Sequence, residues 1–255
     1  MTMELECWRW DTVDEHIAVL TFDRPPVNAQ NRRSREELLW LLDLISDRDD
    51  IHVVVLTGAG KIFSAGADIK ERVTISTEDG DYRAHNRITR DFFYAPTDCT
   101  KPVIGAINGA AIGAGYALAA GCDILIAAES AYIQLPEIDR GLLGGAKFLE
   151  QHFPRTVARL IFYTGRKVNA EAMYRYGMVV DVVPDDQLLE SALTIAREIA
   201  AKQPTVIQKA KATFNTAESM PFREGYVYEQ TQTRELASSD ATRQAQQDFL
   251  DKKIR

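Results

Sequence analysis

The sequence predicts an α/β fold with a mostly parallel sheet, followed by a C-terminal helical region. Short runs rich in β-branched and aromatic residues alternate with helix-like segments through the first half of the chain. Several runs, such as residues 51–57 (IHVVVLT), are almost continuously apolar, as parallel strands covered on both faces usually are. After residue 145 the pattern is mainly helical. We expect an α/β core over residues 1–200 and a helical region over 201–255.

The first predicted helix begins at Ser34, because Glu37 three residues later completes a capping box, and it ends near Ser46. A second helix is expected over residues 84–94 and should stop before Pro96. The segment between them, residues 72–82, has the composition of an exposed, mobile loop. The predicted strands are residues 17–22, 51–57, 103–107, 123–127, 132–134 and 179–183.

Five further helices are predicted in the second half of the chain, over residues 145–151, 155–163, 170–175, 187–201 and 205–214. A terminal helical segment, residues 221–252, has few apolar positions: Tyr226, Leu236, Phe249 and Leu250. These are too few to close a core, so we expect the segment to dock on the core or on a neighbouring subunit.

Composition excludes several classes of partner. The formal net charge of −7 and the isoelectric point of about 5.2 argue against general binding to nucleic acid or anionic membranes. No apolar run reaches the roughly 18 residues that a membrane span needs. The N-terminus is too acidic for a signal peptide, and the three cysteines form no CxxC pair. The sequence therefore predicts a reduced, cytoplasmic protein.

Two clusters of small residues each follow a predicted strand: FSAGADIK (63–70) and GAAIGAGYA (109–117). Small residues allow tight packing of a helix on a sheet, but two clusters at strand ends also suit a ligand site in an α/β fold. Backbone N–H groups from both clusters could converge on one oxygen. Glu137, held after a proline, is either an exposed loop residue or an acid/base opposite that oxygen.

Other chemistries have weaker support. The GAGK turn at residues 58–61 lacks the spacing of a phosphate-binding loop, and Ser64 lacks a nucleophile elbow. His52 is typical of a structural residue, and His85 and His152 have no spacing for metal ligands, so no metal site is predicted.

At these residues the chain resembles the crotonase superfamily, the enoyl-CoA hydratase/isomerase fold. The resemblance covers nearly the whole chain and rests on five segments in the family's order: RPPVNA (24–29), FSAGADIK (63–70), KPVIGAING (101–109), LPEIDRGLLGG (135–145) and FLDKK (249–253). It implies a core built as a ββα spiral, and assembly as homotrimers or dimers of trimers.

The resemblance also implies a site for an acyl-CoA thioester, with CoA as part of the substrate and no permanently bound cofactor. The thioester oxygen would lie between the N–H groups of Ala67 and Ala114, with Glu137 as acid/base. CoA would be contacted by residues of three segments, of which the last often belongs to the adjacent subunit: Val27, Ala65, Asp68, Ile69, Lys70, Phe249 and Lys252.

One position departs from the family's hydratases. Where they carry a second glutamate this chain has Ala117, and addition of water across a double bond is normally assigned to the pair. The lone Glu137 is sufficient for moving a proton from one carbon to another, as in the family's Δ3,Δ2-enoyl-CoA isomerases. Gly145 occupies the place of an extra acid in the family's dienoyl isomerases. Asp139 or Tyr116 could supply a polar group, although a structural role is the simpler interpretation of each.

Three hypotheses follow. The first is an acyl-CoA enzyme of the hydratase/isomerase type that stabilises a thioester enolate. The second is a CoA-dependent hydrolase of a carbon–carbon bond in a β-diketone, because the LPEIDRGLLGGA segment resembles ring-opening members of the family. The third is an inactive binding protein with the same fold.

Overall fold

The computed structural model describes residues 3–77, 80–238, 243, 247 and 250. The contacts within the chain divide it into two units, residues 1–201 and 202–255. No helix in the described part of the chain is long and apolar enough to cross a membrane.

The main sheet of the first unit has six strands in the order β1-β2-β4-β7-β9-β12. The first pair is antiparallel, from Trp8 opposite Phe22 to Val13 opposite Ile17, and all later pairs are parallel. This confirms the predicted α/β fold. The strands are β1 (Trp8–Val13), β2 (Ile17–Phe22), β4 (Val53–Gly58), β7 (Val103–Ile107), β9 (Ile124–Ala128) and β12 (Val182–Val183).

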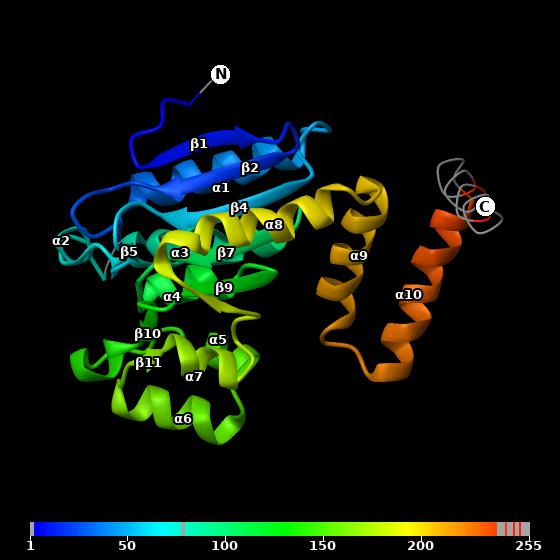
Figure 1. The fold of residues 1–255 in the computed structure, drawn as a ribbon. Helices are drawn as coiled ribbons and strands as arrows, with labels where there is room; N and C mark the ends of the chain where they lie inside the picture. The colour runs from blue at the N-terminus through cyan, green and yellow to red at the C-terminus, as the bar shows by residue number, and fades with distance from the viewer. Residues whose placement is uncertain (1–2, 78–79, 239–242, 244–246, 248–249, 251–255) are drawn as a thin grey trace. The chain divides into compact units, whose positions relative to one another are not determined.

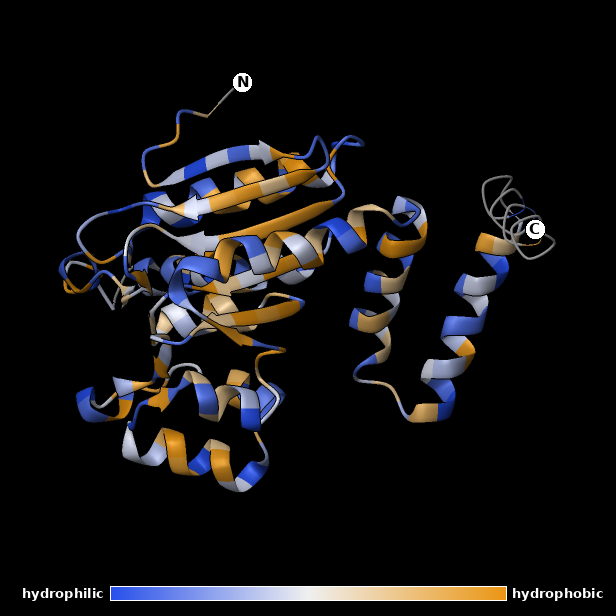
Figure 2. Cartoon of the chain, viewed as in Figure 1, coloured by the Kyte–Doolittle hydropathy of each residue, from blue (hydrophilic) through white to orange (hydrophobic). Residues whose placement is uncertain are grey.

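Burial explains why the central strands are apolar throughout. Val53 to Leu56 of β4 have no exposed surface, and β2 and β7 are nearly as buried. Helix α8 (Leu188–Ala200) packs on β4 and β7 and crosses in front of the sheet in Figure 1, while α1 (Arg32–Ser46) lies behind it. The orange strands of Figure 2 lie between these helices. Each fully buried Val, Leu or Ile contributes roughly 1.5–3 kcal/mol by leaving water.

A second layer of short strands continues the ends of the first. β5 (Ile62–Ser64), β8 (Ala110–Ile112) and β10 (Tyr132–Gln134) are parallel to one another and follow β4, β7 and β9 directly in the chain. A helix or helical turn follows each such pair, which gives the repeated ββα units of the expected spiral. The carboxyl ends of β4, β7 and β9 therefore lead into one region, where ligands usually bind in α/β folds.

The remaining elements of this unit connect or cover the two layers. β3 (Ala29–Gln30) pairs in parallel with β6 (Gly66–Ala67), and β11 (Val168–Asn169) pairs antiparallel with β10. The other helices are α2 (Ile69–Arg72), α3 (Asp81–Asp98), α4 (Ala114–Ala120), η1 (Pro136–Arg140), α5 (Ala146–His152), α6 (Arg155–Thr164), α7 (Ala170–Arg175) and η2 (Asp185–Gln187).

The start of α1 corrects the sequence prediction. Asn31 caps this helix by accepting a hydrogen bond from the N–H of Ser34 (2.9 Å), so Ser34 lies inside the first turn. Glu37 forms no capping box: its carboxylate accepts hydrogen bonds from the N–H groups of Glu6 (3.0 Å) and Cys7 (2.9 Å). The buried acid fixes the N-terminal segment to α1 instead, a long-range contact that sequence spacing does not show.

Other elements also differ from the prediction. α3 continues past Pro96, because the proline lies in its last turn and is buried with Phe92 and Ala95, so packing outweighs one lost hydrogen bond. β1 was not predicted. β12 is shorter than residues 179–183, although Val180 and Asp181 already form backbone hydrogen bonds with β9.

The second unit contains α9 (Pro204–Ala217) and α10 (Phe222–Ala237), which pack on each other. Lys209 of α9 joins them by bonding Gln232 (3.0 Å) and Glu235 of α10. Large apolar side chains stay exposed in this unit, including Phe214 at 76% and Phe222 at 92%. The predicted docking of the region is compatible with this exposure and stays a prediction.

Candidate active site

The two small-residue clusters meet because glycines let their backbones approach. A Cβ atom on Gly66 would lie 2.5 Å from the carbonyl oxygen of Ile112 and 3.3 Å from the nitrogen of Ala114. A Cβ on Gly115 would lie 2.3 Å from the carbonyl oxygen of Ser64. Real Cβ atoms cannot come this close to backbone atoms. The glycines therefore bring the segment of Ala67 against the segment of Ala114.

Ala114 is the first residue of α4, where N–H groups have no acceptor within the helix. The preceding Gly113 provides no side-chain cap and has the unusual backbone angles φ 52° and ψ −113°. Its own N–H bonds the carbonyl oxygen of Gln134 in β10 (2.8 Å). The turn is thus anchored to the second layer while the start of the helix keeps donors for a ligand.

The carboxyl group of Glu137 lies directly over this turn. Glu137 belongs to the η1 turn after β10, and a Cβ on Gly113 would be 2.1 Å from its Oε1 atom. Its Oε2 atom is buried and has no hydrogen-bond partner among the described residues. Burial raises the pKa of Glu137 above the ordinary 4.5, while its own backbone N–H and the charges of Arg140 and Arg72 act in the opposite direction. This is the environment of a group that exchanges a proton.

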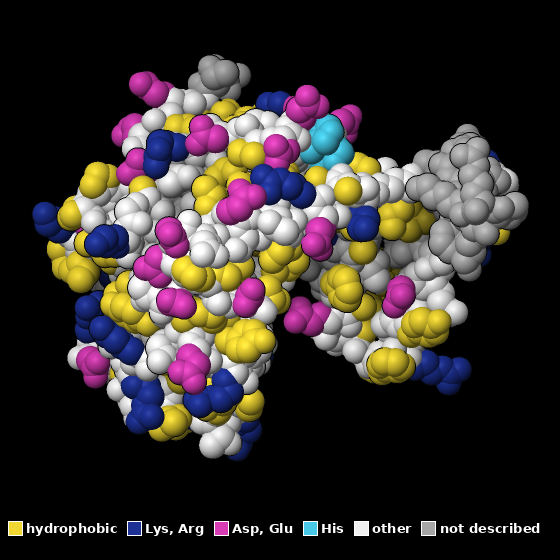
Figure 3. Space-filling model, viewed as in Figure 1, with side chains coloured by type: hydrophobic (Ala, Val, Ile, Leu, Met, Phe, Trp, Pro, Cys, Tyr) yellow, Lys and Arg dark blue, Asp and Glu magenta, His cyan; other side chains and the backbone are white. Residues whose placement is uncertain are grey.

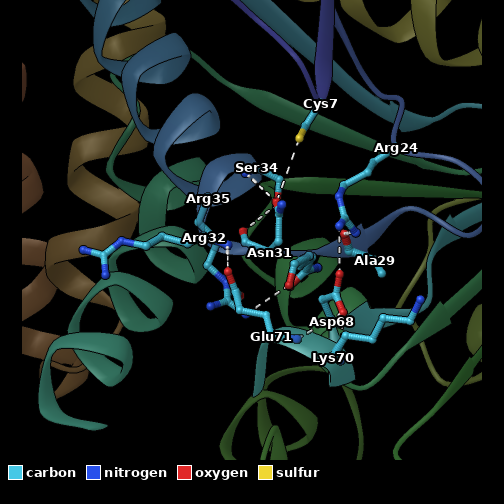
Figure 4. A network of polar contacts seen from close by, with 11 residues as sticks. Cys7, Arg24, Ala29, Asn31, Arg32, Ser34, Arg35, Asp68, Lys70 and Glu71 are labelled. Carbon is cyan, nitrogen blue, oxygen red and sulfur yellow. Dashed lines mark hydrogen bonds and ion pairs between the residues drawn. The ribbon is translucent and has the colours of Figure 1, made fainter. Parts of the chain in front are cut away.

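Asp68, the carboxylate beside the other cluster, has the opposite environment. It forms an ion pair with Arg24 (2.8 Å) and caps α2 by accepting hydrogen bonds from the N–H groups of Lys70 (2.9 Å) and Glu71 (3.4 Å), as Figure 4 shows in part. Burial acts to raise its pKa, but these hydrogen bonds and the Arg24 charge outweigh burial and lower it. Asp68 therefore holds the loop in place through its side chain.

Buried polar residues behind the clusters were missed by sequence reasoning. The amide of Gln30 donates to the carbonyl oxygen of Ala114 (3.0 Å) and to Ser64 Oγ (3.2 Å). Ser64 Oγ in turn donates to the carbonyl oxygen of Asn28 (2.7 Å) and accepts from the N–H of Gly66 (3.2 Å). This network connects both clusters. Its signal in the sequence is weak: two polar residues in the VNAQ segment next to a proline-rich turn.

The residues predicted to contact CoA lie on neighbouring segments where they are described. The N–H of Ala65 bonds the carbonyl oxygen of Val27 (3.0 Å), which joins the two predicted contact segments. Ile69 and Lys70, at the start of α2, have exposed side chains. Phe249 and Lys252 lie outside the described residues.

The two polar residues considered as substitutes for a second acid occupy other places. The Tyr116 ring has no exposed surface, its hydroxyl donates to the carbonyl oxygen of Phe148 (3.0 Å), and burial raises its pKa. Asp139 is exposed and its Oδ2 lies 3.0 Å from where a Cβ on Gly165 would be, at the end of α6. Ala117 is buried in α4 and offers no polar group.

Within the described part of the chain, no group of three or more His, Cys, Asp or Glu side chains could hold a metal ion. His152 contacts the Tyr116 hydroxyl (3.3 Å) and His85 contacts Arg35 (3.4 Å). The three cysteines are free and buried. On the face seen in Figure 3, acidic and basic side chains are interspersed.

Comparison with known proteins identifies the family and agrees with the fold. The family model described as enoyl-CoA hydratase/isomerase matches residues 12–254. The chain is 36% identical, over 94% of its length and 93% of the other's, to the (7aS)-7a-methyl-1,5-dioxo-2,3,5,6,7,7a-hexahydro-1H-indene-carboxyl-CoA hydrolase of Rhodococcus jostii (strain RHA1). It is 33% identical to the carnitinyl-CoA dehydratase of Salmonella typhi, over 83% of this chain and 82% of that one. The enoyl-CoA hydratase of Bacillus anthracis has a similar structure, with a TM-score of 0.91, 30% identity and coverage of 97% of each chain.

Proposed function

The chain belongs to the enoyl-CoA hydratase/isomerase family and is an acyl-CoA enzyme, and from this premise we propose that it hydrolyses a carbon–carbon bond in a β-keto CoA ester. In this proposal the thioester oxygen binds the N–H groups of Ala67 and Ala114, and Glu137 transfers the protons. The bond that breaks joins the α-carbon of the thioester to the ketone carbon.

One observation carries the choice of reaction. Among the residues that the structure describes, Glu137 is a lone carboxyl group over the Gly113 turn, with one buried oxygen free of partners, and Ala117 stands where a hydratase has its second glutamate. Addition of water across a double bond normally uses both acids, whereas one acid/base suffices for the proposed hydrolysis. The hydrolase of Rhodococcus jostii acts on the CoA ester of a dioxo-hexahydroindene, by its name, and this supports the same class of reaction.

The proposed reaction has the following steps. Glu137 takes a proton from water, and the water oxygen forms a bond to the ketone carbon. The bond between this carbon and the α-carbon breaks, and its electron pair moves onto the thioester as an enolate. The amides of Ala67 and Ala114 hold the enolate oxygen; such a donor contributes roughly 2.7–4 kcal/mol to the transition state. Glu137 then returns its proton to the α-carbon, and the new carboxylic acid loses its own proton to solvent.

The unpaired carboxyl of Glu137 also favours a second candidate, the movement of a proton between two carbons of an enoyl-CoA. The same amides would stabilise the dienolate, and Glu137 would remove and return one proton. An inactive binding protein is the third possibility, and it predicts CoA binding without turnover.

An assay of three CoA esters separates these candidates: 2-oxocyclohexanecarboxyl-CoA, 3-hexenoyl-CoA and crotonyl-CoA. Mass spectrometry of the first reaction should show a product heavier by one water, which is the ring-opened pimeloyl-CoA. Turnover of 3-hexenoyl-CoA alone would favour the isomerase. Binding of all three without turnover would leave the binding protein, and hydration of crotonyl-CoA at a comparable rate would contradict the role given to Ala117.

Several further features belong to the same proposal. Val27, Ala65, Asp68, Ile69 and Lys70 contribute to the CoA path, together with Phe249 and Lys252, in some assemblies from a neighbouring subunit. The enzyme assembles as a homotrimer or a dimer of trimers and works in the cytoplasm, in keeping with three free cysteines. The proposed reaction needs no bound cofactor, because backbone amides and one carboxyl group supply its chemistry. Neither nucleic acid nor membrane takes part.

A further inference from the structure

Two arginines near the candidate site have no part in the proposed reaction. Arg35 comes from α1 and Arg72 from the end of α2. Arg35 Nη1 donates to His85 Nδ1 (3.4 Å), and Arg72 Nη2 donates to the Tyr82 hydroxyl (3.1 Å). The rings of Tyr82 and His85 lie 6.4 Å apart on α3. One face of α3 therefore holds both guanidinium groups, which we call the arginine pair.

The arginine pair has no carboxylate in direct contact within the described part of the chain. Arg35 is 1% exposed, and its Nε atom is buried without a hydrogen-bond partner. Among the residues that the structure describes, neither Arg35 nor Arg72 forms an ion pair. Glu71 is the acid whose charge acts on Arg35 without forming an ion pair, and its Oε1 accepts the N–H of Arg32 (2.8 Å), a bond drawn in Figure 4. A buried charge without a partner is costly, so an anion is expected here.

The arginine pair lies next to the reacting groups. Arg35 Nη2 donates to the carbonyl oxygen of Gln30 (3.4 Å), and the Gln30 side chain donates to the carbonyl oxygen of Ala114 (3.0 Å). The positive charge of Arg72 acts on the carboxyl group of Glu137 and lowers its pKa against the larger effect of burial. Gln30 thus joins Arg35 to the oxyanion turn, and the charge of Arg72 acts on the acid/base.

His85 positions Arg35 rather than binding the anion. An arginine can only donate, so Nδ1 of His85 accepts, and Nε2 carries the hydrogen toward Thr89 Oγ1 (3.5 Å). Burial and then the Arg35 charge lower the pKa of His85, which favours this neutral form. The positive charge available to a ligand is therefore that of Arg35 and Arg72.

Resting on the proposed function, we propose that Arg35 and Arg72 form a subsite for a carboxylate on the acyl group of the CoA ester, the group that ring opening releases. The proposed hydrolysis converts an uncharged ring ketone into a carboxylate while the thioester stays in place. Guanidinium groups bind carboxylates with strong, charge-assisted hydrogen bonds. The preferred ligands are accordingly CoA esters whose acyl group ends in a carboxylate or produces one.

The phosphates of CoA are another source of an anion, and they are distinguished by binding measurements on matched ligands. Pimeloyl-CoA and heptanoyl-CoA have equally long acyl groups and differ by a carboxylate in place of a methyl group, while free CoA carries the phosphates alone. Calorimetric titration of the wild type with all three should give about tenfold tighter binding of pimeloyl-CoA than of heptanoyl-CoA.

The variant Arg72→Gln should remove this preference and leave the affinities for heptanoyl-CoA and CoA within about twofold, while Arg72→Lys should retain part of it. Arg90→Gln is the matched control: it removes the same charge from the exposed surface of α3, beside Asp91, and should change nothing. Arg72→Gln must first melt like the wild type. If it does not fold, the wild-type preference and its loss with added salt remain the test.

The outcomes separate the inference from the proposed function. Equal affinity of the wild type for pimeloyl-CoA and heptanoyl-CoA would overturn the carboxylate subsite and leave the proposed function intact. Loss of CoA affinity in Arg72→Gln would assign the arginine pair to the phosphates. If the wild type binds neither ester nor CoA, the proposed function itself is wrong.

Discussion

Two carboxyl groups flank the meeting point of the small-residue clusters, and their environments are opposite. Asp68 has partners on both sides, an arginine and two backbone N–H groups, and its pKa is lowered. Glu137 has a buried oxygen without a partner among the described residues, and its pKa is raised. Both residues lie in segments that resemble the same family, so the sequence alone predicts a role at the site for each of them.

The difference indicates a division of work. A carboxylate stabilised in its charged form contributes to folding, whereas a carboxyl kept from water and from partners costs stability and gains reactivity. We therefore expect changes at Asp68 to affect stability more than turnover, and changes at Glu137 to do the reverse.

The largest expected effect is that of Glu137→Gln on turnover. Loss of the acid/base should lower kcat for the ring-opening reaction by about 10²–10⁴-fold. Stability at neutral pH should stay equal or increase, since the variant removes a partly buried carboxyl group whose pKa is raised. Product formation measured by chromatography and urea unfolding check the two parts. The control is Asp139→Asn, in the same η1 turn but exposed, and its kcat should stay within twofold of the wild-type value. A larger loss of kcat would indicate that Asp139 takes part in the reaction.

The second prediction tests whether turnover depends on the position of the Glu137 carboxyl group as well as on its presence. A methyl group on Gly113 would come within 2.1 Å of Glu137 Oε1, so Gly113→Ala must displace the carboxyl group. A shift of about 1 Å can cost roughly 100-fold in rate, and we expect that loss in kcat.

Gly141→Ala is the matched control for Gly113→Ala. Gly141 also has a positive φ, of 66°, but nothing lies within 4 Å of its added methyl group. Gly141→Ala should lose about 1 kcal/mol of stability from its left-handed backbone, and Gly113→Ala should lose more, because φ 52° with ψ −113° lies outside the left-handed region; only Gly113→Ala should lose most of its activity. Equal activity of the two variants would contradict the placement of Glu137.

A smaller effect is expected from Asp68→Asn. Asparagine caps a helix about as well as aspartate, so the variant mainly breaks the ion pair with Arg24, whose side chains are 30% and 13% exposed. Because this ion pair is only partly exposed, we expect a loss of about 1 kcal/mol in the free energy of unfolding, measured with urea. The kcat of Asp68→Asn should remain within about threefold of the wild-type value. A loss as large as that of Glu137→Gln would contradict the proposal that Asp68 serves stability and Glu137 serves turnover.

The last prediction concerns pH. Since the pKa of Asp68 is lowered from 3.8, its stabilisation is present above pH 3.8 and is lost as pH falls through the lower, folded-state pKa. Since the pKa of Glu137 is raised from 4.5, its contribution is most favourable below pH 4.5 and is lost as pH rises through the higher, folded-state pKa. Urea unfolding of each wild-type and amide-variant pair as a function of pH should show these opposite slopes.

The same shift should appear in catalysis. If Glu137 must be ionised to take a proton from water, the acidic limb of kcat/KM has its midpoint above pH 4.5, and the limb disappears in the residual activity of Glu137→Gln. A midpoint at or below 4.5 in the wild type would mean that another group controls the acidic limb.

Particular elements mark how far the sequence could predict the fold. The strands at residues 103–107 and 132–134 agree with β7 and β10 to the residue, because a proline marks one end of each run, Pro102 before β7 and Pro136 after β10. The α1 cap was misplaced, since Glu37 is used by a segment some thirty positions away. Pro96 was misread as a helix end for the same reason: buried packing outweighs a local rule.

The candidate site also has parts that the sequence predicts and parts that it does not. Its backbone elements, the two clusters of small residues and Glu137 after a proline, are visible as residue types and spacings. The Gln30–Ser64–Asn28 network and the arginine pair are not, because each joins side chains from segments far apart in the chain.

By itself, the sequence determined the α/β fold, the family and the absence of a second acid at Ala117, because composition, periodicity and ordered motifs are local properties of the chain. Only the tertiary structure decided which carboxyl group is stabilised and which is left without a partner. Desolvation and ion pairing depend on the atoms that folding places around a group, and no spacing along the chain records them. Asp68 and Glu137 both supply a carboxyl group in the sequence, but the folded structure shifts their pKa values in opposite directions, so the chemistry open to each differs.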